Sequence, residues 1–161
     1  MGRERGLITL EFYMAAPKTF RVRIVDWSEE RGRLLGVRTG VFVVEQGVPV
    51  EIEQDGRDAE CAHVLALDAN GEAVGAGRLM PDGRIGRMAV LAGWRGSGVG
   101  GAMLRALMDE ARRRGHRETY LHSQSHARAF YERHGYSVEG EEYLEAGIPH
   151  VGMRAQLERP S

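Results

Sequence analysis

Five glycines fall within nine residues, between Gly93 and Gly101, where a strand-like run meets a helical pattern. The run before them, "RMAVL", is mostly apolar, and Val99, Met103 and Leu107 recur after it at helical spacing. Glycine is the residue that costs most to order, so such a cluster needs a physical reason. The first turn of a helix leaves main-chain N–H groups without partners, and the helix dipole adds positive potential there. The pattern therefore requires a strand–loop–helix unit and predicts that its loop binds a phosphate or diphosphate.

The candidate anion-binding groups are the main-chain amides of this loop and one arginine. Glycines keep side chains away from the amides, and the arginine adds a charge-assisted donor at the loop entrance. A tight turn that binds no anion is the structural alternative. The residues concerned are Arg95, Gly96, Ser97, Gly98, Val99, Gly100 and Gly101.

The same loop also matches a dinucleotide-binding pattern. Gly96, Gly98 and Gly101 satisfy GxGxxG, a weak signal by itself. A dinucleotide site begins a run of alternating strands and helices and has an acidic residue at the end of the next strand. Here turn-linked strands precede the loop, the next strand ends in "HSQ", and no Gly-Lys-Ser/Thr follows. The context therefore argues against a nicotinamide-dependent oxidoreductase and a P-loop nucleotide site.

Turn signals divide the middle of the chain into strands. Asn70-Gly71 separates "AHVLALD" from "AVGAGRLM", and Pro81-Asp82-Gly83 leads into "RIGRMAVL". Residues 62–91 are thus predicted to form a three-stranded antiparallel meander. The helix after the glycine loop ends at "RRRG", and "TYLHS" follows as a strand parallel to the last strand of the meander.

The segments on either side complete one α+β domain. "FRVRIV" alternates like a half-buried strand, and Ser28 is predicted to cap a helix that reaches about Glu45. Residues 47–58 read as a loop rich in turn formers and carboxylates. Ser125 is predicted to cap a helix over residues 127–134, and "YSVEG" and "HVGMRAQL" supply late strands. We predict a mixed, mostly antiparallel central sheet flanked by helices.

The sequence predicts a single folded domain. We predict a leader over 1–18, one domain over 19–157 and a short tail over 158–161.

Composition excludes several classes of protein. The 22 basic and 23 acidic residues balance, which argues against a nucleic-acid binder. No segment has the length of a membrane span, and the N-terminus lacks the apolar run of a signal peptide. Cys61 is the only cysteine, so a reducing, cytoplasmic location is expected.

The segment "RMAVLAGWRGSGVGGAML" resembles the acyl-CoA-binding motif of the GCN5-related N-acetyltransferase (GNAT) superfamily. The pattern Arg/Gln-x-x-Gly-x-Gly/Ala is matched by Arg95, Gly98 and Gly100. A second superfamily motif, Asn-x-x-Ala-x-x-x-Tyr ending in Gly-Phe, is similar to "QSHARAFYERHGY", with Gln124 in place of Asn and Tyr136 in place of Phe. The resemblance covers nearly the whole predicted domain. "GVFVVEQGVP" and "EAGIPHVGM" further resemble the ElaA/YjcF-like branch.

This resemblance implies direct transfer of an acetyl group from acetyl-CoA to an amine. The glycine loop would anchor the coenzyme A diphosphate, and the strand Met88-Ala89-Val90 would pair with the pantetheine arm and polarise the thioester carbonyl. The sheet would splay between this strand and Thr119–Ser123, with the thioester in the gap. Further cofactor contacts are implied for Gln124, Ala127, Phe130 and Tyr131.

Two proton transfers need side chains. Tyr131 occupies the position that often protonates the departing thiolate, although a packed aromatic is the alternative. The acceptor amine must lose a proton, and Glu45 is slightly favoured as the base because it ends an apolar helix. Glu51 and Glu53, with His122 and His150, are also candidate substrate contacts, and the acidic loop suggests a rim that attracts a cationic acceptor. The candidate bases are Glu45, Glu51, Glu53, Asp55, His122 and His150.

Two functions of different classes remain open. The first is an N-acetyltransferase that acts on a small-molecule or protein amine. The second is a catalytically idle module of the same fold that binds or senses acyl-CoA. No metal, nucleic acid or membrane is expected as a partner, and pairing through the late strands, common in the superfamily, would give a homodimer.

Overall fold

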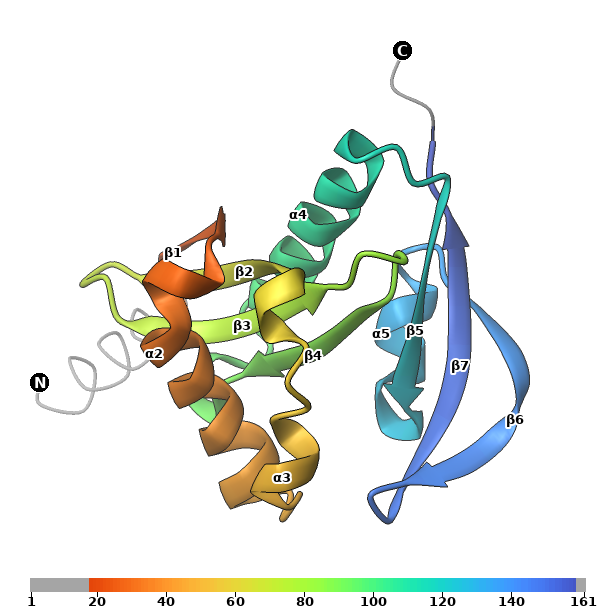
Figure 1. The fold of residues 1–161 in the computed structure, drawn as a ribbon, viewed down its shortest axis with the longest axis horizontal. Coiled ribbons are helices and arrows are strands. Elements are labelled where there is room, and N and C mark those ends of the chain that lie inside the picture. Colours follow the sequence, from red (N-terminus) through yellow and green to blue (C-terminus); the bar gives the residue numbers. More distant parts are fainter. Residues whose placement is uncertain (1–17, 159–161) are drawn as a thin grey trace, which may run out of the picture.

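The computed structural model describes residues 18–158, which form two antiparallel sheets (Figure 1). The first has the order β1-β2-β3-β4, and the second has the order β5-β7-β6. The predicted meander and late strands are confirmed, as is the α+β class. The strands are β1 (Phe20–Val25), β2 (Ala62–Asp68), β3 (Ala73–Leu79), β4 (Ile85–Val90), β5 (Glu118–Gln124), β6 (Ser137–Glu145) and β7 (Ile148–Gln156).

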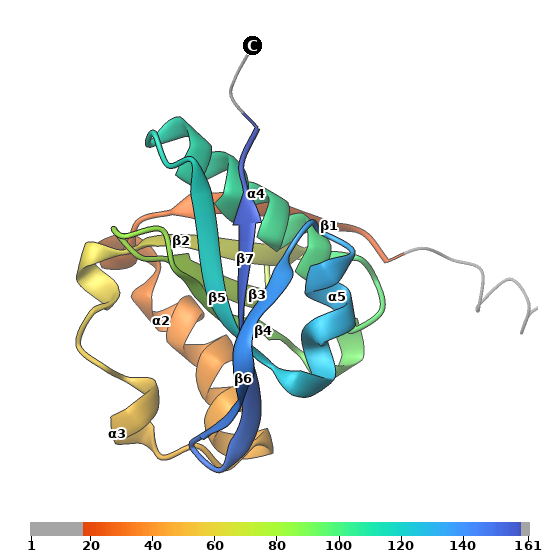
Figure 2. The ribbon, with the colours of Figure 1, turned by 90° about the vertical axis from the view of Figure 1, so that its right-hand side faces the viewer.

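The sequence predicts one continuous sheet in which β4 and β5 are parallel neighbours, but the structure divides it there. An isolated parallel bridge joins Arg84 to Tyr120, and the Tyr120 N–H donates to the Gly83 carbonyl at 3.3 Å. Beyond this bridge the two strands diverge (Figure 1), as the GNAT resemblance implies. In Figure 2 the second sheet lies in front of the first, and its strands run steeply across the strands of the first sheet. The divergence leaves one edge of β4 without a strand partner.

The first helix begins earlier than the sequence predicts. α2 (Trp27–Arg38) has Asp26 at its N-cap, in an extended conformation, so the prediction that Ser28 caps it is wrong. The helix continues as a π-helical segment, η1 (Thr39–Glu45), so its predicted end near Glu45 is confirmed. The loop predicted over 47–58 contains two helical turns, α3 (Val50–Glu53) and the start of η2 (Asp58–Glu60).

The later helices follow the prediction with one difference. α4 (Val99–Arg113) starts directly after the glycine loop and ends before Gly115. The helix predicted over 127–134 is α5 (Arg128–Glu132), preceded by a 3-10 turn, η4 (Ser125–Ala127). The Ser125 hydroxyl does not cap it and instead donates to Glu142 at 2.8 Å.

Alternation along β2 directs side chains into a hydrophobic core on each face of the first sheet. Leu65 and Leu67 pack against Leu34 and Val37 of α2. Val64 and its neighbours on the other face pack against α4. Burial of such side chains is worth roughly 1.5–3 kcal/mol each, which fixes both helices on the sheet.

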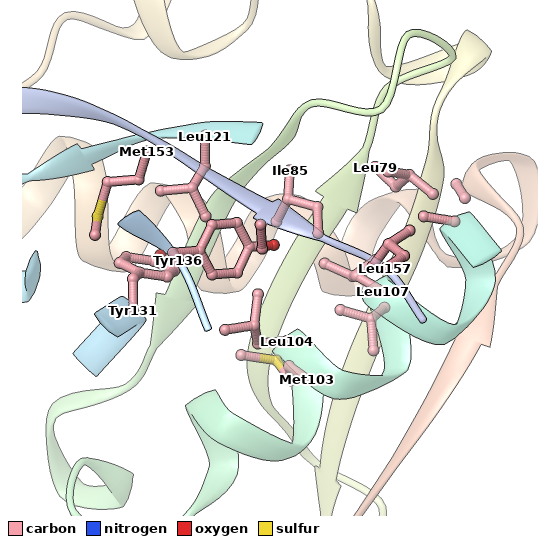
Figure 3. Close-up of a cluster of buried hydrophobic side chains, with 14 of the residues drawn as sticks. Leu79, Ile85, Met103, Leu104, Leu107, Leu121, Tyr131, Tyr136, Met153 and Leu157 are labelled. Carbon is pink, nitrogen blue, oxygen red and sulfur yellow. The ribbon is translucent and has the colours of Figure 1, made fainter. Parts of the chain in front are cut away.

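The core under α4 also contains side chains of the second sheet. Figure 3 shows Leu121 of β5 and Met153 of β7 close to Tyr131 and Tyr136. These four side chains belong to the same buried cluster as the core residues of α4. Because α4 packs on the first sheet as well, it holds the two diverging sheets in place. The gap between β4 and β5 is therefore part of the folded architecture.

The predicted leader, apart from Lys18, lies outside the described residues, as does most of the tail. The Lys18 ammonium group donates to the Gly93 carbonyl and lies over the Trp94 ring. Between residues 18 and 158, no helix combines the length and apolar character needed to cross a membrane.

Candidate active site

A cavity of about 1010 Å³ occupies the gap between the diverging strands. Its walls come from η1 and α3, from β4 and the glycine loop, from β5 and α5, and from the hairpin between β6 and β7. Elements far apart in the sequence thus meet at one site. Among the predicted cofactor residues, the cavity wall includes Met88, Ala89, Val90, Arg95, Gly96, Gly98, Gly100, Gly101, Gln124, Ala127, Phe130 and Tyr131.

The glycine loop presents a row of free main-chain amides. Gly96 and Gly98 have φ values of 78° and 89°, in the left-handed region that favours glycine. The first helical hydrogen bond runs from the Ala102 N–H to the Gly98 carbonyl at 3.1 Å. Within residues 18–158, no acceptor meets the N–H groups of residues 96–101. This arrangement can bind an anion at the positive end of α4.

One of these glycines has a second role that the sequence did not indicate. A Cβ atom at Gly101 would lie only 3.1 Å from Nε2 of His134, whereas one at Gly100 would lie 3.5 Å from Cζ of Phe130, an ordinary van der Waals distance. At Gly101, access to the amides is thus not the only reason for glycine, because the segment after α5 also packs closely against the start of α4.

Arg95 lies at the loop entrance, as predicted, but it is already paired. Its Nε donates to the Val90 carbonyl at 3.0 Å, and its terminal nitrogen contacts Glu45 at 2.8 Å. Glu45 was the favoured candidate for the base. Both carboxylate oxygens of Glu45 accept from this guanidinium, so the geometry favours Glu45 as an ion-pair partner that restrains Arg95 over Glu45 as a base.

Glu45→Gln separates these two roles. Loss of a base would lower kcat by roughly 10²–10⁴-fold. Loss of an exposed ion pair, worth about 0.2–1 kcal/mol, would free Arg95 and tighten coenzyme A binding by at most about fivefold. We expect the second result from steady-state kinetics and calorimetric titration. Glu132→Gln, which removes an exposed ion pair with Arg128 away from the cavity, is the control.

Tyr131 has a buried ring and a hydroxyl group without a protein partner. The side chain is 9% exposed, lines the cavity and packs edge-on against Phe130 and Tyr136. Its hydroxyl makes no hydrogen bond within the described chain, whereas the Tyr136 hydroxyl is bonded to Thr119 at 2.6 Å. Burial raises the pKa of Tyr131 well above its ordinary value, so the phenol stays protonated and can donate.

The β4 backbone is irregular where the thioester is expected. The register between β3 and β4 shifts near Ala76 and Arg78, so Arg87 and Met88 have no β3 partner. Arg87 has a φ of 51°, unusual for a side-chain-bearing residue. Met88 therefore lies at a bulge of β4 and borders the cavity, on a strand whose other edge has no partner among the described strands.

The predicted acidic rim does not form, because its carboxylates belong to a buried network. Arg38 donates to Glu53 at 2.9 Å and to Asp58 at 2.7 Å, and Arg78 contacts Asp55 at 2.6 Å. Three arginines balance three carboxylates in this network. Its members are Arg38, Glu53, Asp55, Asp58, Arg78 and Arg87.

These pairings disfavour the loop carboxylates as bases. The hydrogen bond from Arg78 lowers the pKa of Asp55 far below its ordinary range. Glu53 borders the cavity but is 2% exposed, with Arg87 Nε 2.9 Å from its second oxygen. Glu51 is exposed and is not part of the cavity wall. The remaining candidate bases are histidines.

His122 and His150 come together on the side of the cavity away from the glycine loop. Alternation along β5 buries Leu121 and Ser123 in the core and turns His122 toward the opposite face. His122 Nδ1 is hydrogen-bonded to the Tyr143 hydroxyl, and the Tyr143 and His150 rings lie 6.0 Å apart. The two histidines thus share one cluster with Tyr143.

Gln124 is not free, as its predicted cofactor contact would require. Its amide donates to the Gln46 side chain at 2.8 Å, and its oxygen is 2.7 Å from His126 Nε2. Gln46, at the end of η1, was not a candidate in the sequence, because only the fold brings it to β5. The Gln46–Gln124 pair connects the two walls of the cavity.

The sequence also missed cationic residues that border the cavity. Arg105 and Arg133 line it from α4 and from the end of α5, and Arg84 lines it where β4 begins. Each is an ordinary surface arginine in the sequence, with no motif around it. Within the described range, no group of three or more His, Cys, Asp or Glu side chains is arranged to hold a metal ion.

Comparison with known proteins identifies the family. A family model described as an acetyltransferase (GNAT) domain matches residues 35–157. The uncharacterized N-acetyltransferase YjcF of Bacillus subtilis (strain 168) is 44% identical over 121 residues, 73% of this chain and 86% of that protein. The chain therefore belongs to the GNAT acetyltransferase family and is an acyltransferase by class.

Two solved structures support the same placement. Escherichia coli ElaA is similar with a TM-score of 0.77 and 29% identity, over 86% of this chain and 100% of that chain. An acyl-CoA N-acyltransferase from Pseudomonas aeruginosa is similar with a TM-score of 0.75 and 32% identity, over 85% and 99%. The predicted resemblance to the ElaA/YjcF-like branch is confirmed.

Proposed function

We propose that the protein transfers the acetyl group of acetyl-CoA directly to an amine. The observation that carries this proposal is that two unsatisfied features border one cavity. The first is the row of amides at residues 96–101 and the second is the protonated hydroxyl of Tyr131, and neither has a hydrogen-bond partner within residues 18–158. The amides are suited to bind a diphosphate, and the Tyr131 hydroxyl is suited to protonate a departing thiolate.

The residues at the glycine loop fit coenzyme A. These N–H groups donate to no acceptor within residues 18–158, and the glycines leave open the space that side chains would fill. Arg105 and Arg133 add positive charge to the same end of the cavity, which favours a ligand with several phosphates. Arg95, which is hydrogen-bonded to the Val90 carbonyl and to Glu45, lies between the glycine loop and the edge of β4.

The protein groups near the β4 edge have separate tasks. Acetyl-CoA supplies an activated thioester when it is bound. The main chain at the Met88 bulge would polarise the thioester carbonyl, as an oxyanion hole does. Tyr131 holds a proton for the sulfur, and its surroundings of Phe130 and Tyr136 exclude water. A further group, on the side of the cavity away from the glycine loop, must take the proton of the amine.

The proposal is tested by ligand binding and by turnover. Coenzyme A and acetyl-CoA are expected to raise the melting temperature, and NAD and ATP to raise it less, because a ligand stabilises the state that binds it. Release of the coenzyme A thiol is then followed with amino acids, polyamines, aminoglycosides and peptides as acceptors. We expect amine-dependent release.

Each outcome separates the candidate functions. Stabilisation by NAD and not by coenzyme A would contradict the proposal. Binding of acetyl-CoA without amine-dependent thiol release from any acceptor would support the idle, sensing module instead.

A further inference from the structure

Among residues 18–158, the charged groups on the side of the cavity away from the glycine loop are paired, with one exception. Arg87 contacts Glu53 at 2.9 Å, and His150 Nε2 contacts Glu145 at 3.3 Å. The Arg84 guanidinium has neither an ion pair nor a hydrogen bond within residues 18–158. It is half-buried and borders the cavity. This side of the cavity therefore carries one unbalanced positive charge.

The position of Arg84 is fixed by the fold. It lies where β4 and β5 are still bridged, at the closed end of the gap between the sheets. Its N–H donates to Asp82 at 3.1 Å, and its carbonyl accepts from the Met80 N–H at 2.8 Å. It borders the same cavity as His122, and its charge lowers the pKa of His122 and opposes the rise in the pKa of Tyr143.

His122 is held with one nitrogen free. Nδ1 is bonded to the Tyr143 hydroxyl, and no described residue bonds to Nε2. The Tyr143 ring lies against His150, whose Nδ1 donates to the Ile148 carbonyl at 2.7 Å. If Nδ1 of His122 carries the proton and donates to Tyr143, Nε2 is an acceptor toward the cavity.

The electrostatic surroundings keep this imidazole neutral. Partial burial lowers the pKa of His122 first, and the charge of Arg84 lowers it further. Glu145 raises the pKa and His150 lowers it, and the Tyr120 ring packs edge-on at 6.3 Å. A histidine that is neutral near pH 7 can accept a proton.

We propose that the acceptor is an amine with a carboxylate a few atoms away, as in an α-amino acid, whose carboxylate Arg84 binds while His122 Nε2 takes the amine proton. This inference rests on the proposed acetyl transfer. A guanidinium binds a carboxylate through charge-assisted hydrogen bonds. A polyamine would instead place a second ammonium group beside Arg84. The cavity wall also has apolar residues that suit an apolar side chain on the acceptor, among them Phe42, Val48, Ile52 and Ile148.

The step balances with these groups. The ammonium form of the acceptor gives one proton to His122 Nε2 and becomes the nucleophile. Its nitrogen forms a bond to the thioester carbon as the carbon–sulfur bond breaks. The sulfur takes the proton of Tyr131, the phenolate takes the second proton of the nitrogen, and His122 releases its proton to solvent.

The test compares matched acceptors. Leucine, methionine and phenylalanine are assayed against their carboxamides and against 1,4-diaminobutane, by release of the coenzyme A thiol. A hydrogen bond to a charged group is worth about 1.5–3 kcal/mol, so we expect kcat/KM to favour the amino acids roughly ten- to hundredfold. Arg84→Gln should bring this ratio close to one, whereas Arg21→Gln, at an exposed position on β1 outside the cavity, should leave it unchanged.

Two readouts keep the inference open to contradiction. Arg84→Gln should also move the acid limb of the pH profile to higher pH, because Arg84 lowers the pKa of His122. His122→Gln should remove that limb and lower kcat by roughly 10²-fold or more. Faster turnover of the carboxamides or the diamine, or an unchanged ratio in Arg84→Gln, overturns the inference and leaves acetyl transfer intact. Absence of thiol release with every acceptor, with coenzyme A still bound, contradicts the proposed function itself.

Discussion

Tyr131→Phe is expected to lower kcat for acyl transfer by roughly 10²-fold and to leave the Kd of coenzyme A unchanged. The hydroxyl has no partner within the described chain, so its removal breaks no hydrogen bond of the fold. The ring, 9% exposed, remains in its packing between Phe130 and Tyr136. Loss of rate would therefore reflect the missing proton donor. Single-turnover kinetics and calorimetric titration with coenzyme A measure the two quantities.

Tyr136→Phe is the matched control for this result. Its hydroxyl bonds to Thr119 at 2.6 Å inside the core, so its loss should cost about 1 kcal/mol of stability. We expect kcat in this variant to stay within a few-fold of the wild-type value. Equal rates for wild type and Tyr131→Phe would show that Tyr131 is only a packed aromatic. Equal losses in both variants would point to packing instead of proton transfer.

Arg38→Met is expected to lower the free energy of unfolding by about 3–5 kcal/mol, because it leaves buried carboxylates without their main partner. Arg38 and Glu53 are 1% and 2% exposed, and Arg38 also holds Asp58. The total stability of a domain is about 5–15 kcal/mol, so this is a large fraction. Urea unfolding followed by circular dichroism measures it.

Arg57→Met is the control for an exposed pair. Arg57 contacts Glu60 at 2.6 Å, but both side chains are about half exposed. Such pairs contribute about 0–1 kcal/mol, so we expect a small change. A loss of similar size in the two variants would contradict the distinction between the buried network and surface pairs. If Arg38→Met does not fold, Arg38→Lys is measured instead. It keeps the positive charge but loses the paired N–H donors of the guanidinium, so its free energy of unfolding should lie between those of the wild type and Arg38→Met.

The network also predicts how stability depends on pH. Burial raises the pKa of Asp58, but Arg38 and Arg78 outweigh it, and Arg78 lowers that of Asp55. Both folded-state pKa values thus lie below the unfolded value of about 3.9. The stabilisation is present above about pH 4 and is lost as the pH falls below it. Arg38→Met should weaken this acid dependence, which unfolding at several pH values can measure.

The local features of the site could be predicted from the sequence. A free amide at a helix start depends on a few neighbouring residues, so the glycine loop predicted the N–H groups of residues 96–101 that have no acceptor within residues 18–158. The Asn-Gly and Pro-Asp-Gly turns likewise predicted the meander, because the geometry of each turn is set by its own residues. The divergence of β4 and β5 came from the GNAT resemblance, not from the pattern of either strand.

The partners of the charged residues could not be predicted. Glu45 and Arg95 are 50 residues apart, and Arg78 meets Asp55 across 23 residues. Composition makes every arginine a candidate for every carboxylate, and only the packed fold selects pairs. The pairing of Glu45 with Arg95 and the burial of Glu53 in the network were not predicted for this reason. Arg84 was missed because its lack of a partner is visible only once the other charges are placed.

The central claim is that the amides of residues 96–101 bind the diphosphate of coenzyme A. A crystal structure of the complex with coenzyme A tests it most directly. We expect diphosphate oxygens within about 3 Å of these main-chain nitrogens and the sulfur beside the Tyr131 hydroxyl. A diphosphate bound elsewhere, with the glycine loop empty, would contradict the account.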